Sequence, residues 1–284
     1  MTKTPSILAA LACLAAATPL AAEEAPRTAC PASPEARFDP ATDLLLAHFD
    51  LKSDVDDMHS VAALATMLAH PDLVCVEAFA VTGTYGTQDG PYVPADALFD
   101  LAFGEAWADA HADPAAAAEA VAERMEAALT SGGDVWVMEG GQADVTAAAA
   151  RLVAARAPDL DLSRLHVVQH SDWNEKVTSP DALETLRTQA DYRRIPDGNA
   201  VGNGTPGFKT DDAALWPTLT GDPAVGPIWA EARRAAKVAN GLGYVNTAVA
   251  AGGLDFSDAA EAAWIFGYED LRDHQDFAET FLNR

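Results

Sequence analysis

Basic residues are scarce in this chain of 284 residues, in which 18 lysines and arginines stand against 43 aspartates and glutamates. The formal net charge of −25 would repel a phosphate backbone, and no Lys/Arg-rich run offsets it, so the composition argues against nucleic acid as a partner. Hydrophobic residues make up 49% of the chain, which is enough for a full core. The length favours one large domain over two.

Long hydrophobic runs are missing as well, so no transmembrane span is expected. The apolar run Ile7–Ala17 is too short to cross a bilayer, and small residues follow it up to Ala22. This pattern is typical of a secretory signal peptide. We therefore predict a signal peptide at 1–22, an N-terminal arm at 23–42 and one domain at 43–284, in a periplasmic or secreted protein.

Cysteine is rare too, with three in the chain, and Cys13 falls inside the predicted signal peptide. In an oxidising compartment Cys30 and Cys75 could form a disulfide bond. Two free thiols are equally compatible with the sequence.

Several catalytic and nucleotide-binding motifs are absent. The chain has no Walker A loop, no G-x-G-x-x-G after a predicted strand and no G-x-S-x-G elbow. What it has is an alternation of strand-like and helix-like segments, repeated at least four times. We predict an α/β fold, with a mostly parallel central sheet and helices on both faces. Strands are expected at 44–49, 73–81, 134–138 and 165–169, helices at 55–69, 95–129 (broken near 113), 143–156, 180–189, 228–239 and 258–266, and loop over most of 191–227.

Four carboxylates, those of Asp50, Asp54, Asp56 and Asp57, lie where the first strand ends and the first helix begins. Ligands bind at this edge of a parallel sheet. Like charges this close repel one another unless a cation or hydrogen-bond donors compensate them. Ca²⁺ takes roughly six to eight oxygen ligands, and the cluster could supply several. Helix capping is the alternative role, but it would explain only one of the four.

This stretch resembles the opening motif D-x-D-x-x-x-D-D of the inosine-uridine nucleoside hydrolase superfamily. Asp50 matches the first position, and Asp56 and Asp57 match the closing pair. Lys52 takes the place of the second aspartate, which in the family binds calcium and activates water. Asp54 is an additional acid, and the pattern is closer to D-x-x-x-[DE]-x-D-D of a divergent branch of the superfamily.

Later segments extend the resemblance. The segment 135–145 looks like the family's strand and loop in which a backbone carbonyl binds calcium, with Gln142 or Ala143 in that place. The Asp172-Trp173-Asn174 stretch is similar to the family's E-x-N sugar-binding motif. The last calcium-binding carboxylate of the family matches Asp258, or alternatively Asp255.

The resemblance implies a Rossmann-like nucleoside hydrolase fold and calcium-dependent cleavage of the N-glycosidic bond of a ribonucleoside or related glycoside. It implies metal ligands at Asp50, Asp57, Gln142 and Asp258, and sugar-binding residues at Asp56, Asp172 and Asn174. Asp54 would replace the missing base, and His170 would protonate the leaving group.

Other side chains have competing roles. His59 could donate a proton or lie on a helix surface, whereas His48 is expected to be a hydrogen-bonded core residue. Trp173 and Tyr85 could stack on a nucleobase or belong to the core or rim.

Lys52 also leaves the function open, because without the usual base the chain could be a non-catalytic nucleoside- or carbohydrate-binding protein. A metal-dependent phosphatase is a third hypothesis, weakened by the shortage of basic residues. The sequence leaves a homo-oligomer open.

Overall fold

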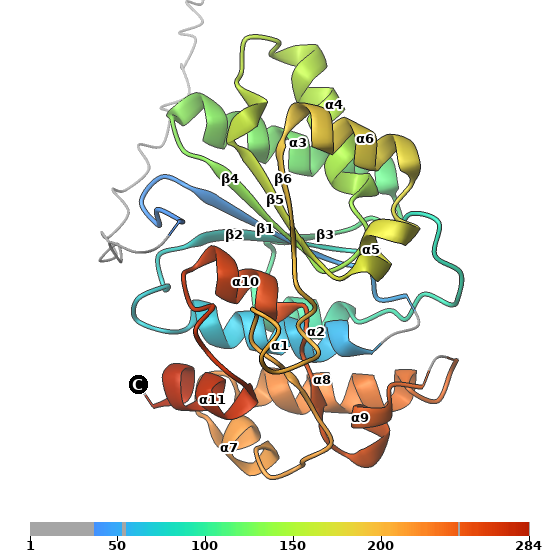
Figure 1. Ribbon diagram of the computed structural model, residues 1–284, viewed down its shortest axis with the longest axis vertical. Helices are drawn as coiled ribbons and strands as arrows, with labels where there is room; N and C mark the ends of the chain where they lie inside the picture. Colours follow the sequence, from blue (N-terminus) through green and yellow to red (C-terminus); the bar gives the residue numbers. More distant parts are fainter. Residues whose placement is uncertain (1–36, 53–54, 244, 284) are drawn as a thin grey trace, which may run out of the picture.

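The computed structural model describes residues 37–52, 55–243 and 245–283, and its centre is a parallel sheet of six strands (Figure 1). The strand order is β3-β2-β1-β4-β5-β6, with every pairing parallel. This is the strand order of the Rossmann-like doubly wound fold. Successive strands are added toward one edge of the sheet up to β3 and toward the other edge from β4 onward, so the order switches between β1 and β4. The predicted α/β class with a parallel central sheet is confirmed.

The elements follow the chain in a regular alternation. The sheet strands are β1 Leu44–Phe49, β2 Glu77–Thr82, β3 Trp107–Asp109, β4 Val135–Glu139, β5 Leu165–His170 and β6 Asp191–Ile195, and a short antiparallel pair is formed by β7 Lys209–Thr210 and β8 Leu254–Asp255. The helices are α1 Asp56–Leu68, α2 Asp96–Phe103, α3 Pro114–Ser131, α4 Asp144–Arg156, α5 Asp172–Val177, α6 Pro180–Gln189, α7 Trp216–Gly221, α8 Gly226–Ala239, α9 Thr247–Ala251, α10 Ala259–Ile265 and α11 His274–Leu282, with a 3-10 turn at Leu162–Arg164.

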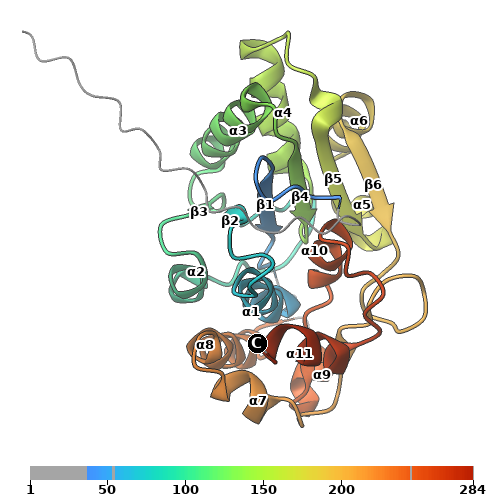
Figure 2. The same ribbon diagram turned by 90° about the vertical axis from the view of Figure 1, so that its left-hand side faces the viewer.

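Helices cover both faces of the sheet, as predicted (Figures 1 and 2). The helices α3, α4 and α6 lie over one face, and α1, α2 and α10 lie over the other. The C-terminal helices α7, α8, α9 and α11 form a further layer outside α1 (Figure 1). Contacts between α1 and α8 join this layer to the rest of the domain.

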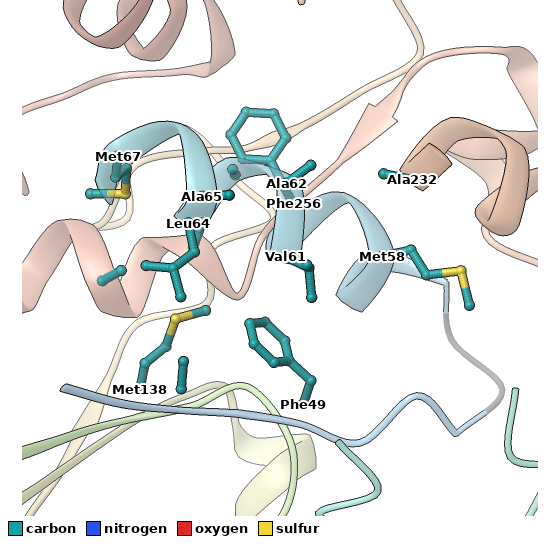
Figure 3. Close-up of a cluster of buried hydrophobic side chains, with 14 of the residues drawn as sticks. Phe49, Met58, Val61, Ala62, Leu64, Ala65, Met67, Met138, Ala232 and Phe256 are labelled. Carbon is teal, nitrogen blue, oxygen red and sulfur yellow. The ribbon is translucent and has the colours of Figure 1, made fainter. Parts of the chain in front are cut away.

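Each face of β1 belongs to a different hydrophobic core, because successive side chains of a strand point to opposite faces. Leu44 and Leu46 pack on the α3/α4 side, while Leu45, Ala47 and Phe49 pack on the α1 side. Figure 3 shows Phe49 and Met138 under Val61 and Leu64 of α1. All four side chains are fully buried, so α1 and its N-terminal aspartates are held in place over the end of β1.

The edge strands β6 and β3 were not predicted. The expectation of loop over most of 191–227 is wrong at Asp191–Ile195, and the expectation of helix over 95–129 is wrong at Trp107–Asp109. Strand β6 reads Asp-Tyr-Arg-Arg-Ile and exposes both arginines, so it lacks the apolar signature of a buried strand. It pairs with β5 on one side only, and its main-chain hydrogen bonds therefore depend on a neighbour that local sequence does not reveal.

The described part of the arm, from Arg37, packs against the C-terminal region. Phe38 is buried edge-on against Phe266, with ring centres 5.2 Å apart. Cys75 is disulfide-bonded, whereas its predicted partner Cys30 and the predicted signal peptide lie outside the described residues. No helix within the described ranges is both long and apolar enough to span a membrane.

Candidate functional site

A pocket of about 170 Å³ opens at the carboxyl edge of the sheet, beside the ends of β1, β4 and β5. Seven residues singled out from the sequence line it together: Asp50, Asp56, Asp57, His170, Trp173, Asn174 and Asp258. Five further lining residues are Gln88, Gly140, Ser171, Asp197 and Asn199. We call this the acidic pocket, because five aspartates and no lysine or arginine are among the described residues that line it.

The backbone at the start of the pocket is arranged around Asp57. Leu51 follows Asp50 with a positive φ of 49°, a conformation that a residue with a Cβ rarely adopts. Its amide donates a 2.8 Å hydrogen bond to Asp57 Oδ2. Helix α1 begins at Asp56, directly after Val55, which supplies no capping side-chain hydrogen bond.

Asp50 is buried at the end of β1 and is held from two directions. Its Oδ1 accepts from the amide of Lys52 at 2.6 Å, and its Oδ2 accepts from Gln142 Nε2 at 2.8 Å. The Gln142 amide also bonds Gln88, whose side chain lines the pocket. Gln142 therefore positions Asp50 from behind. Neither Gln142 nor Ala143, one of whose backbone carbonyls was the predicted metal ligand, is among the described residues that line the pocket.

Two glycines after β4 allow the β1 and β4 loops to approach each other. A Cβ on Gly140 would lie 3.0 Å from Asp258 Cβ, and one on Gly141 would lie 2.5 Å from Thr84 Oγ1 and 2.9 Å from Asp50 Cβ. All three distances are shorter than ordinary contacts of a Cβ atom. Any larger residue at these two positions would therefore push Asp50 or Asp258 away from the pocket.

His170 ends β5 and is enclosed by two carboxylates. Its backbone amide and its Nδ1 both face Glu261 Oε1, at 2.6 and 3.2 Å, and its Nε2 lies 3.7 Å from Asp258 Oδ1. His170, Asp258 and Glu261 are all buried. Asp258 lines the pocket and Glu261 does not, so Nδ1 faces the interior and Nε2 lies on the pocket side.

This arrangement shifts the protonation of all three groups. Burial lowers the pKa of His170, but the hydrogen bond and charge of Glu261, with the charges of Asp258 and Asp197, outweigh burial and raise the pKa to about 9. Burial raises the pKa of Glu261 to about 7, although His170 opposes the rise. Burial also raises the pKa of Asp258 well above its ordinary value, against the charge of His170. The surrounding carboxylates therefore favour the protonated form of the His170 ring.

Asn174 lies where the resemblance implies, but Asp172 does not. Asn174 is buried in α5, lines the pocket and donates to the Gly140 carbonyl at 3.4 Å. The Asp172 side chain is 87% exposed and pairs with Arg194, outside the pocket lining. The turn at Ser171, with φ at 65°, starts α5 so that Asn174 faces inward and Asp172 faces solvent. The sugar-binding role implied for Asp172 therefore has no support from its position.

Lys52 is directed to one side of the acidic pocket. Its Nζ contacts the Gln88 carbonyl at 2.6 Å and lies 4.0 Å from the centre of the Tyr85 ring. Tyr85 does not line this pocket either, since its hydroxyl bonds His111 at 2.7 Å. Asp54, the predicted base, lies outside the described residues.

Of the other candidate residues, His48 is a buried core residue as expected, with Nδ1 2.9 Å from Thr146 Oγ1. His59 is buried beneath α8 and α9 and does not line the acidic pocket. Trp173 lies on the pocket rim, half exposed. Asp255, the alternative to Asp258, is buried in an ion pair with Lys209 at 2.8 Å.

Sequence reasoning missed four polar residues that complete the site: Gln88, Asp197, Asn199 and Glu261. Asp197 and Asn199 follow the unpredicted strand β6 and reach the pocket because β6 lies beside β5. Glu261 is in the Ala-rich helix α10, 91 residues from His170. The sequence signal that could have indicated Glu261 is its charge, since the rest of α10 is apolar.

The fit of a cation to the acidic pocket is mixed. Within the described ranges, no three or more His, Cys, Asp or Glu side chains are grouped so as to hold a metal ion. The donor types suit a hard cation, because carboxylates of Asp50, Asp57 and Asp258 line one pocket. The buried Oδ2 of Asp258 also has no hydrogen-bond partner among the described residues.

Comparison with models of protein families and with curated proteins found no match to this chain. The functional argument therefore depends on the residues of the acidic pocket.

Proposed function

We propose that this protein hydrolyses the N-glycosidic bond of a ribonucleoside or a related glycoside. The observation that carries the proposal is the pairing of opposite charges in the acidic pocket. Carboxylates line the pocket from four places in the fold, and His170, whose protonated form they favour, is held among them by Glu261 and Asp258. These are the two charges that the reaction needs on either side of the glycosidic bond.

The carboxylates would act on the sugar. Cleavage passes through a transition state in which the sugar carries positive charge, so an anionic pocket lowers its energy relative to the neutral substrate. Asp50 and Asp57 are buried and fixed by hydrogen bonds, which means they need not reorganise as that charge develops. Asp56 and Asn174 would bind the sugar hydroxyls.

His170 would act on the leaving base. A nucleobase departs as an anion unless a proton reaches it, and the imidazolium of His170 is a proton donor at neutral pH. Glu261 holds Nδ1 from behind, so the proton on Nε2 is the one that can reach the substrate. Trp173 at the rim would stack on the base.

Calcium is part of the proposal, with Asp50, Asp57 and Asp258 as the residues that would hold it. When bound, such an ion orients a sugar diol and lowers the pKa of a bound water. Asp54 stays the proposed base. Export to the periplasm or outside the cell also stays a proposal, supported by the disulfide bond of Cys75.

A non-catalytic binding protein of the same fold is the second candidate, favoured by Lys52 at the position of the usual base. The phosphatase hypothesis is weaker, because no lysine or arginine lines the described part of the acidic pocket. Ligand binding without turnover in the parent and turnover in Lys52→Asp would support the binding protein.

The direct test is ribose release from a panel of purine and pyrimidine nucleosides by the mature chain, with and without added Ca²⁺. We expect release from at least one nucleoside, lost in Asp57→Asn. Asp172→Asn is the matched control, since it makes the same change outside the pocket. Failure of the folded, calcium-supplied protein to cleave any of them would count against hydrolysis, and binding measurements on the same panel would then test the second candidate.

A further inference from the structure

A second pocket, of about 520 Å³, lies on the far side of α1 from the acidic pocket, in the outer helical layer. Helix α8 provides one wall, and the end of α9 with Gly252 and Gly253 provides another. Trp216 of α7 and His59 of α1 complete the lining. We call it the basic pocket, for the reason given next.

Three of the chain's 18 lysines and arginines line this pocket: Arg233, Arg234 and Lys237. No aspartate or glutamate is among the described lining residues. Arg234 is paired with Glu231 at 2.5 Å. Arg233 lies 4.6 Å from the centre of the Trp216 ring, and neither it nor Lys237 has an ion-pair partner in the described part of the chain. In a protein of net charge −25, Arg233 and Lys237 therefore form a local concentration of positive charge that no ion pair among the described residues compensates.

One residue of the basic pocket, His59, carries a buried hydrogen-bond donor for which the described residues supply no acceptor. His59 is 1% exposed, and its Nδ1 accepts the Asp255 amide at 3.2 Å. That bond places the proton of the neutral ring on Nε2. Nε2 is buried and has no hydrogen-bond partner among the described residues.

Cations on an exposed helix face are ordinary, and solvation alone would account for them. Solvation does not account for His59, because a buried donor without an acceptor costs stability of about 1–3 kcal/mol unless a ligand or water supplies the acceptor. The His59 residue and the cations belong to the lining of the same cavity. That cavity is larger than an inorganic ion needs, so an organic anion fits it better.

We propose that the basic pocket binds a small organic anion through a phosphate or carboxylate group, held by Arg233, Lys237 and the Nε2–H of His59. The two head groups share the same chemistry, since both accept charge-assisted hydrogen bonds from guanidinium and ammonium groups. This proposal is independent of glycoside hydrolysis in the acidic pocket.

Calorimetric titration of the mature chain with inorganic phosphate, ribose 5-phosphate and citrate tests it, with neutral ribose as the negative ligand. We expect at least one anion to bind. The double variant Arg233→Gln/Lys237→Gln should weaken binding by about tenfold or more. The matched control is Arg151→Gln/Arg156→Gln, which removes two exposed cations from α4 on the other side of the sheet. It should change affinity by about twofold at most, as for exposed surface charges.

A third variant tests the buried donor. His59→Phe removes Nε2–H and should also weaken binding, with retained folding checked by circular dichroism. Binding of ribose 5-phosphate without citrate would assign a phosphate head group, and the reverse would assign a carboxylate. Absence of binding by all three anions would overturn the proposal. So would equal weakening in the double variant and its control, because that would indicate general charge attraction.

Discussion

His170 and His59 are both buried, yet they face opposite electrostatic surroundings. His170 lies between the carboxylates of Glu261 and Asp258, and its pKa is raised to about 9. His59 lies near Arg233, with a backbone amide on its Nδ1, and its pKa is lowered to about 3. Burial disfavours the charged form in both cases. Burial is the main cause of the lowered pKa of His59, with a smaller contribution from Arg233, whereas the carboxylates around His170 outweigh burial and favour its protonated form.

The same contrast separates the two pockets. The acidic pocket has a cation enclosed by carboxylates, an arrangement that can give up a proton and stabilise positive charge on a sugar. The basic pocket has a neutral donor beside cations, an arrangement that can hold an anion, and its described lining includes no carboxylate to act as a base. A single residue of α1, Met58, separates Asp57 from His59, so one helix contributes to both pockets.

The largest expected effect is on catalysis. Replacing His170 with glutamine removes the proton donor while keeping a polar side chain, and nucleoside hydrolysis should fall about 10²–10⁴-fold. The control is His166→Gln, at the opposite end of the same strand, where the ring pairs with Asp191 at 2.7 Å. Equal activity of His170→Gln and the control would remove His170 from the mechanism.

Lowering the pH should reduce the stability of the fold through protonation of His59 in the unfolded state. Its folded pKa of about 3 lies below the ordinary 6.5, so stability is present above pH 6.5 and is lost as pH falls toward 3. From pH 6.5 to pH 5 this loss should amount to about 2 kcal/mol in the wild type. Urea unfolding at both pH values measures it, and His59→Gln should show a correspondingly smaller loss. An unchanged loss would mean that His59 already titrates in the folded protein.

For His170 the pH dependence of stability should have the opposite sign, so that raising the pH reduces stability. Its folded pKa of about 9 lies above 6.5, so stability is fully present below pH 6.5 and is lost as pH rises through 9. Between pH 6.5 and 8 the wild type should lose about 2 kcal/mol more than His170→Gln, by the same unfolding measurement. Parallel curves for the two proteins would contradict the raised pKa.

A smaller effect is expected when the charge beside His170 is removed, which should lower the pKa of His170 toward that of His59. Glu261→Gln keeps a hydrogen-bonding group but removes the charge that opposes burial, so the pKa of His170 should fall by about one unit or more. The alkaline limb of kcat/KM should move to lower pH by the same amount. If the limb stays in place, Glu261 does not control the proton of His170.

The smallest effect is expected at the rim. Trp173→Ala should raise KM for nucleosides by about three- to tenfold through loss of stacking, with kcat little changed. Trp173→Phe should retain most of the affinity. A fall in kcat alone would instead place Trp173 in contact with the reacting groups.

The fold was predictable where local sequence and burial agree. The apolar segment 44–49 and the helix 180–189 have the predicted bounds. Strand β6 was missed because it is exposed and charged, and its place depends on pairing with β5.

The site was predictable where residues follow strands, because parallel strand ends meet at one edge. Asp50, Asp56, Asp57, His170, Asn174 and Asp258 are brought together for this reason. Asp172 was misplaced, since the helical turn of α5 directs it away from its neighbour Asn174. Glu261 was missed because its role arises only from the packing of α10 against β5.

A pH titration of the histidine side chains by nuclear magnetic resonance tests most directly whether the acidic pocket holds His170 as a cation. Resonances would be assigned with His170→Gln and His59→Gln. We expect His170 to titrate near pH 9 and His59 to remain neutral down to pH 5. Titration of His170 at or below 6.5 would contradict the charge arrangement on which the proposed proton transfer depends.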